Sequence, residues 1–121
     1  MATNIPFYWK TTCHTCRAAK KELEEEKMVA IDPIDIMKTP PSKEILQTLV
    51  GKYGIKAMIR KNSRDYKELG VSSMTLTPER VVRLLHAHPD LAARPIVVTS
   101  SGVFLSRDPE LYNHLPEKSQ D

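Results

Sequence analysis

The sequence predicts an α/β fold, in one domain with a helical segment inserted between two parts of a small sheet. Residues 4–36 have the pattern strand, helix, strand; residues 40–90 carry helix signals; and residues 93–116 return to two strands and a helix. A length of 121 residues is that of one ordinary domain.

The first segment predicts a buried strand that leads into a helix. Residues 5–9 (IPFYW) are apolar and aromatic, and polar residues 10–12 end this run. From Arg17 to Lys27, apolar residues recur at helical spacing among Lys and Glu, without Gly or Pro. Cys13 and Cys16 therefore stand where the helix begins.

A second strand is expected over residues 29–36. Apolar residues alternate with other residues before Pro33 (Val29 and Ile31) and again after it (Ile34 and Ile36). Pro33 cannot donate a ladder hydrogen bond, so this strand should have an edge position or a bulge at its middle. A strand, helix, strand unit of this length implies a right-handed parallel crossover.

Two capped helices are predicted in the middle of the chain. Ser42 follows two prolines and can cap a helix that runs to about Tyr53. Thr77 can cap another, with Pro78 in its first turn and its end before Pro89. The residues expected to face the core are Leu46, Leu49, Val50 and Tyr53 in the first helix and Val81, Leu84 and Leu85 in the second.

The last part predicts an antiparallel hairpin and a short helix. Residues 95–98, after Arg94, and residues 103–105 are apolar, and Ser100-Ser101-Gly102 between them is a turn signal. Asp108 and Pro109 can start a helix that reaches about Leu115, followed by a frayed tail over 117–121. This order of elements matches a thioredoxin-like fold with helices inserted between its halves.

Composition excludes several classes of protein. The net charge of +3, from 18 basic and 15 acidic residues, is too small for a nucleic-acid-binding surface, although an anionic small molecule remains compatible with it. No apolar stretch is long enough to span a membrane, and the N-terminus lacks the pattern of a secretory signal. We therefore expect a cytoplasmic protein with no direct contact with nucleic acid or membrane.

The spacing of Cys13 and Cys16 indicates a chemical use. A disulfide across two residues closes almost no loop, so it would restrain the unfolded chain little. Unpaired N–H groups at the helix start favour a thiolate at Cys13, and Arg17, one turn on, adds positive charge. Cys16 should be less exposed and less acidic, and can attack an oxidised Cys13.

Two other uses would also fit two cysteines at this spacing: inert packing as small apolar residues, and zinc binding. Zinc would need two more ligands. His14 is poorly placed, and His86 and His88 would point to different sides of a helix. Redox use is favoured over both, so no metal is expected.

Three arginines stand beside turn or strand-end signals, and guanidinium groups suit bidentate binding of oxyanions. They are Arg60, Arg94 and Arg107. Taken singly, each of these arginines is more typical of a solvated surface residue than of a binding residue. Pro95 allows a cis peptide bond beside the Cys13 loop, although only about one X-Pro bond in twenty is cis in folded proteins.

Several motifs resemble the ArsC/Spx family of small thioredoxin-fold proteins, which includes glutaredoxin-dependent arsenate reductases and the transcriptional regulator Spx. In chain order, they are Phe7-Tyr8 through Cys13-x-x-Cys16-Arg17, residues 59–62 (IRKN) with 66–70 (YKELG), and His88-Pro89 with 94–99 (RPIVVT). The resemblance implies that Cys13 attacks arsenate, that Arg60, Arg94 and Arg107 hold the oxyanion, and that Pro95 is cis. Glutathione, glutaredoxin or thioredoxin would supply electrons.

The resemblance also suggests other functions. Arsenate reductases of this type usually have histidine where this chain has Trp9, and commonly have serine in place of Cys16. A C-x-x-C is the pattern of Spx, which implies a regulator whose Cys13–Cys16 disulfide changes affinity for the RNA polymerase α subunit. A general thiol-disulfide reductase would make little use of the arginines. Three matched arginines favour the arsenate-reductase interpretation.

Overall fold

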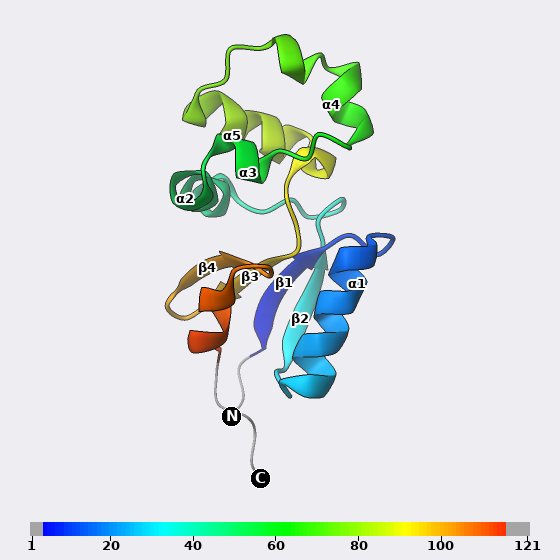
Figure 1. The fold of residues 1–121 in the computed structure, drawn as a ribbon, viewed down its shortest axis with the longest axis vertical. Coiled ribbons are helices and arrows are strands. Elements are labelled where there is room, and N and C mark those ends of the chain that lie inside the picture. The colour runs from blue at the N-terminus through cyan, green and yellow to red at the C-terminus, as the bar shows by residue number, and fades with distance from the viewer. Residues whose placement is uncertain (1–3, 116–121) are drawn as a thin grey trace. The chain divides into compact units, whose positions relative to one another are not determined.

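The computed structural model describes residues 4–115, which divide into two compact units (Figure 1). The sheet unit takes the chain up to Asp35 and again from Arg94 onward, and the helical unit is Ile36–Ala93. The predicted α/β class is confirmed. Among the described residues, every helix is too short or too polar to cross a membrane.

The sheet has four strands in the order β2-β1-β3-β4. The strands are β1 (Ile5–Trp9), β2 (Ile31–Asp35), β3 (Ile96–Thr99) and β4 (Gly102–Leu105). β1 and β2 are parallel, whereas β3 is antiparallel to both β1 and β4, which confirms the predicted hairpin. Pro33 lies opposite Phe7 on β2, and the edge position of β2 explains how a residue without an N–H is tolerated there.

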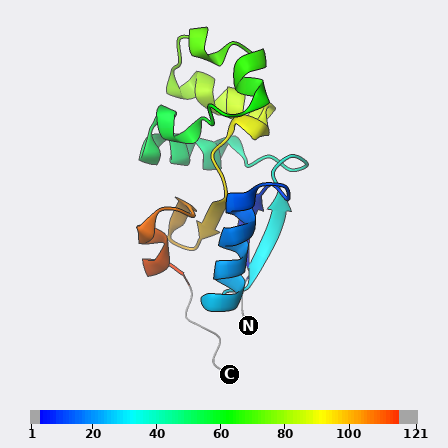
Figure 2. The same cartoon turned by 45° about the vertical axis from the view of Figure 1, so that its right-hand side comes forward.

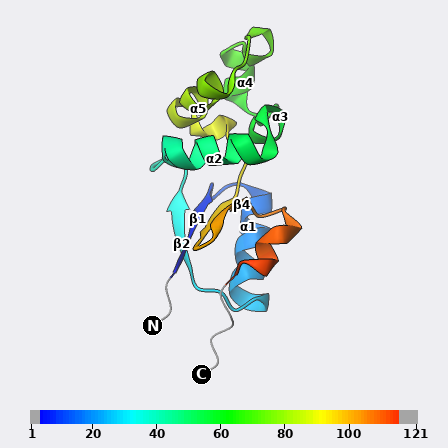
Figure 3. The ribbon, with the colours of Figure 1, turned by 90° about the vertical axis from the view of Figure 1, so that its left-hand side faces the viewer.

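One face of the sheet is covered by α1 (His14–Lys21) and by a 3₁₀ helix near the C-terminus, Pro109–Asn113 (Figure 3). α1 continues into a π-helical turn, Glu22–Glu26. Beneath them, Phe7, Val97 and Phe104 pack in one core cluster with Leu23 and Leu111. This face of the sheet therefore has its own apolar core.

The last helix differs from the prediction. It is a 3₁₀ helix that ends at Asn113, two residues short of Leu115. The Asp108 side chain accepts a hydrogen bond from the Glu110 N–H at 2.9 Å, as a cap should. A segment this short makes only a turn and a half, a length at which 3₁₀ geometry is common. The tail predicted over 117–121 lies outside the described residues.

The helical unit contains both predicted capped helices. Its helices are α2 (Lys43–Tyr53), α3 (Ile55–Met58), α4 (Arg64–Glu68) and α5 (Pro78–Ala87), with 3₁₀ turns at Val71–Ser73 and Pro89–Leu91. α2 packs against α5 (Figure 2). Ser42 and Thr77 each accept a backbone N–H at 3.2 Å, which confirms both caps.

The buried face of α5 is rotated from the predicted one. Val81 and Leu85 are buried as expected, but Val82 is buried in place of Leu84, which is partly exposed. Both sets of positions fit a helical period, and the packing partner decides which one faces inward. In α2, Leu46, Leu49 and Val50 are buried as predicted, whereas Tyr53, in the last turn, is only partly buried.

Candidate functional site

Cys13 lies in the connection between β1 and α1. Its N–H donates to the Lys10 carbonyl at 2.9 Å, which closes a turn directly after the strand. Its carbonyl accepts from the Arg17 N–H at 3.0 Å, the first hydrogen bond of the helix. Cys13 is thus the N-cap of α1, with an extended backbone (φ −83°, ψ 121°). The strand and the turn hold its side chain at the helix start.

The Cys13 sulfur has hydrogen-bond donors around it. The Cys16 N–H donates to Sγ at 3.4 Å. Partial burial by itself would raise the Cys13 pKa, but hydrogen bonds from the Cys16 thiol and N–H, together with the hydrogen bond and charge of Arg94, lower it below the ordinary 9.0. The site therefore favours a thiolate on Cys13.

Cys16 has the opposite character. Its side chain is fully buried, on the inward side of α1. Burial first, and then the neighbouring Cys13 sulfur, raise the pKa of the Cys16 thiol to about 12, against opposing effects of the Lys10 backbone and the Arg94 charge. At neutral pH the Cys16 thiol keeps its proton and donates a hydrogen bond to the Cys13 sulfur. Both cysteines are free thiols in the structure.

The sheet register explains why Arg94 reaches Cys13. Tyr8 pairs with Ile96 across the antiparallel strands β1 and β3. In antiparallel strands a step forward on one is a step back on the other, so two residues beyond this pair Arg94 stands opposite Lys10. Lys10 is the residue at which the Cys13 turn begins. Arg94 is followed by Pro95, and the peptide bond between them is cis.

The other predicted arginines differ in their surroundings. Arg17 is exposed on α1, and Arg107 is exposed after β4. Arg60 belongs to the helical unit, where its Nη1 donates to the Asp90 carbonyl at 3.3 Å. Arg94 is the predicted arginine that acts on the Cys13 thiol, and the oxyanion-binding roles of Arg60 and Arg107 stay predictions. Within residues 4–115, no three His, Cys, Asp or Glu side chains are grouped so as to hold a metal ion.

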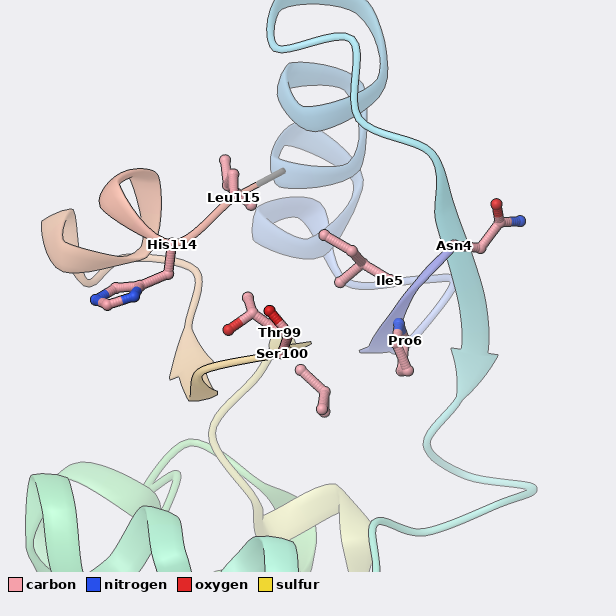
Figure 4. A pocket seen from close by; sticks show the side chains of 8 residues that line it. Asn4, Ile5, Pro6, Thr99, Ser100, His114 and Leu115 are labelled. Atoms are coloured by element: carbon pink, nitrogen blue, oxygen red, sulfur yellow. The ribbon is translucent and has the colours of Figure 1, made fainter. Parts of the chain in front are cut away.

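Two hollows in the sheet unit were not predicted. One, of about 360 Å³, lies at the other end of β1 from Cys13, between Pro6, Thr99 and His114, and none of the predicted site residues lines it (Figure 4). The second, of about 250 Å³, lies along α1 and includes Trp9 and Arg17. The sequence signal for the second hollow was the set of cations that follow Cys13 by four, seven and eight residues, Arg17, Lys20 and Lys21.

Comparison with known proteins gives one consistent family. The sequence model of the ArsC family matches residues 8–115. An arsenate reductase from Yersinia enterocolitica is 37% identical over 123 aligned positions, covering 98% of this chain and 85% of the relative.

Solved structures agree with this match. An ArsC family related protein from Bacteroides fragilis has a TM-score of 0.76 at 30% identity, covering 92% of this chain and 97% of that one. An arsenate reductase from Vibrio cholerae has a TM-score of 0.73 at 30% identity, covering 92% and 96%. The residues matched by the family model include both cysteines and all three arginines.

Proposed function

This chain belongs to the ArsC family, and from that premise we propose that it reduces arsenate to arsenite with Cys13 as the attacking thiol. The observation that carries the proposal is the pair of cysteines at the start of α1. The Cys13 sulfur accepts the Cys16 N–H at 3.4 Å and has a lowered pKa, whereas the buried Cys16 holds its proton. One residue is suited to attack, and the other to resolve.

The first step forms a sulfur–arsenic bond. The Cys13 thiolate attacks the arsenic atom of arsenate, and one oxygen, once protonated, leaves as water. An oxyanion at this point would meet the guanidinium of Arg94, which already interacts with the Cys13 thiol. We assign the remaining charge of the oxyanion to Arg60 and Arg107, following the family resemblance. Guanidinium groups would stabilise the charge that develops in the transition state.

The second step reduces the arsenic. The Cys16 thiol attacks the Cys13 sulfur, so that a disulfide forms and the sulfur–arsenic bond breaks. The bonding electron pair stays on arsenic, which becomes As(III), and the thiol proton passes to an oxygen of the departing arsenite. Two thiols are thereby oxidised for each arsenate reduced. An external thiol, either glutathione or the dithiol of glutaredoxin or thioredoxin, then restores both cysteines.

Arsenite release in the presence of a thiol-reducing system tests this proposal. Wild-type protein should turn over arsenate, and Cys13→Ser should reduce none. Arg94→Ala should lower kcat/KM by a factor of about 100 or more, as expected for loss of a charge-stabilising donor. Lys43→Ala, which removes an exposed cation of the helical unit, serves as the control. Wild-type turnover no faster than that of Cys13→Ser would overturn the proposal.

A second candidate, an Spx-like regulator, is favoured by the hydrogen-bonded pair of cysteines itself. A Cys13–Cys16 disulfide would remove the thiolate and its interaction with Arg94, which changes the local charge without any substrate. Capture of the C-terminal domain of the RNA polymerase α subunit under oxidising and reducing conditions tests it. Equal absence of binding in both conditions would exclude this function.

A further inference from the structure

Backbone hydrogen bonds tie the segment that carries Arg60 to residues 91–93 of the helical unit. The Arg60 N–H donates to the Leu91 carbonyl at 2.7 Å, and the Ala93 N–H donates to the Met58 carbonyl at 2.9 Å. An antiparallel bridge lies between these two hydrogen bonds. The backbone of Arg60 is therefore fixed, but a long arginine side chain would still have many rotamers to choose from.

The Arg60 side chain belongs to a closed ring of hydrogen bonds with Ser63 and Asp90. Its Nη1 donates to the Asp90 carbonyl at 3.3 Å. The Asp90 carboxylate accepts from Ser63 Oγ at 2.8 Å, and the Ser63 N–H donates to the Arg60 carbonyl at 3.2 Å. Each of the three residues is thus bonded to the other two. The guanidinium can leave this position only if a hydrogen bond of the ring breaks.

Ser63 joins this ring to the start of α4. It is 5% exposed, and within residues 4–115 no other hydroxyl-bearing or charged residue is as buried. A buried hydroxyl is costly unless it is hydrogen-bonded, and Ser63 Oγ, besides donating to Asp90, accepts the Asp65 N–H at 3.2 Å, which caps α4. α4 packs against the 3₁₀ turn Pro89–Leu91, which carries Asp90. The cap of a short helix therefore holds its hydroxyl against the Asp90 carboxylate.

We propose that Ser63 and Asp90 are positioning residues that hold the Arg60 guanidinium in place for the oxyanion, an inference that rests on the role proposed above for Arg60. The guanidinium has five N–H donors, and the contact with the Asp90 carbonyl uses one of those on Nη1. The edge formed by Nε and Nη2 can therefore bind two oxygens of a tetrahedral oxyanion. A side chain that is already ordered loses less conformational entropy on binding, so the oxyanion binds more tightly.

Arsenate affinity measured without turnover tests this inference. Isothermal titration calorimetry in a Cys13→Ser background gives the Kd for arsenate, because that protein lacks the attacking thiol. Adding Asp90→Ala, which leaves the cap of α4 in place, should raise the Kd about five- to tenfold, as expected when one long side chain must be ordered on binding. Ser63→Ala should also raise the Kd, and Ser63→Thr, which keeps the hydroxyl, should restore it. Ser72→Ala, which removes an exposed hydroxyl of the same unit, should leave the Kd unchanged.

A second background separates positioning from a merely structural role. In Arg60→Ala, the further change Asp90→Ala should alter the arsenate Kd by less than twofold, because the side chain that Asp90 positions is gone, whereas any loss of melting temperature should persist. An arsenate Kd unchanged by Asp90→Ala, equal weakening with and without Arg60, or no arsenate binding to Cys13→Ser would overturn the inference. If the wild type shows no turnover but Asp90→Ala still weakens arsenate binding through Arg60, the proposed function is refuted and this inference stands.

Discussion

Alkylation by iodoacetamide tests the order of acidity of the two cysteines. At pH 7, a pKa of about 12 leaves ~10⁻⁵ of Cys16 as thiolate. A pKa below 9.0 leaves at least ~10⁻² of Cys13 in that form. Cys13 therefore has at least a ~10³-fold advantage in thiolate. The Cys13 thiolate is less basic than a Cys16 thiolate and is therefore the weaker nucleophile. For a difference of roughly three pKa units between the two thiols, this reduces the advantage of Cys13 about 30-fold.

The net expectation is that Cys13 reacts at least ~30-fold faster than Cys16. The buried position of Cys16 adds to the difference. The assay is a timed reaction of the reduced protein with the reagent, followed by mass spectrometry of the two cysteine peptides. Labelling of Cys16 at a rate equal to or above that of Cys13 would refute the reasoning about burial and hydrogen bonding.

Arg94→Gln tests how the positive charge of Arg94 affects the Cys13 pKa. It removes a cation that lowers the Cys13 pKa, so the midpoint of the pH–rate profile should move upward. Arg17→Gln, the matched control, removes an exposed cation of α1 and should move the midpoint less. An unchanged midpoint in Arg94→Gln would show that the guanidinium does not act on this thiol.

Three further predictions concern stability. Leu111→Ala should lower the free energy of unfolding by about 2–5 kcal/mol in urea titrations, because Leu111 is fully buried in the sheet-unit core, whereas the exposed control Asn113→Ala should change it by less than ~0.5 kcal/mol. Cys16 in the folded protein keeps its proton to about pH 12, whereas the ordinary thiol pKa is 9.0, so the free energy of unfolding should fall as the pH rises above 9.0. Cys16→Ala lacks this thiol and should lose less stability over that range, by up to ~1.4 kcal/mol per pH unit. An identical pH dependence of stability in both proteins would contradict the raised pKa. Thr77→Ala removes the cap of α5 and should cost about 1 kcal/mol in thermal unfolding, with Thr77→Ser restoring most of it; an unchanged melting temperature would mean that the cap contributes nothing.

Local features were predictable where the interaction is short in sequence. The caps at Ser42 and Thr77 bond to an N–H three residues ahead, so a few residues contain the whole signal. Pro33 indicated an edge strand because its missing N–H is a property of the residue itself. The helices α3 and α4 were not predicted individually, since four or five residues carry too little periodicity.

The α/β class, the order of the main elements and the position of Cys13 at a helix start could all be predicted from the sequence. These follow from hydrophobic periodicity, caps and turn residues, which act over one or two turns of chain. The tertiary structure decided that Arg94 acts on Cys13, because the pairing of β1 with β3 joins segments more than eighty residues apart. It also decided that Cys16 keeps its proton and that Trp9 faces a charged hollow. Burial and long-range electrostatics depend on neighbours that sequence spacing does not specify.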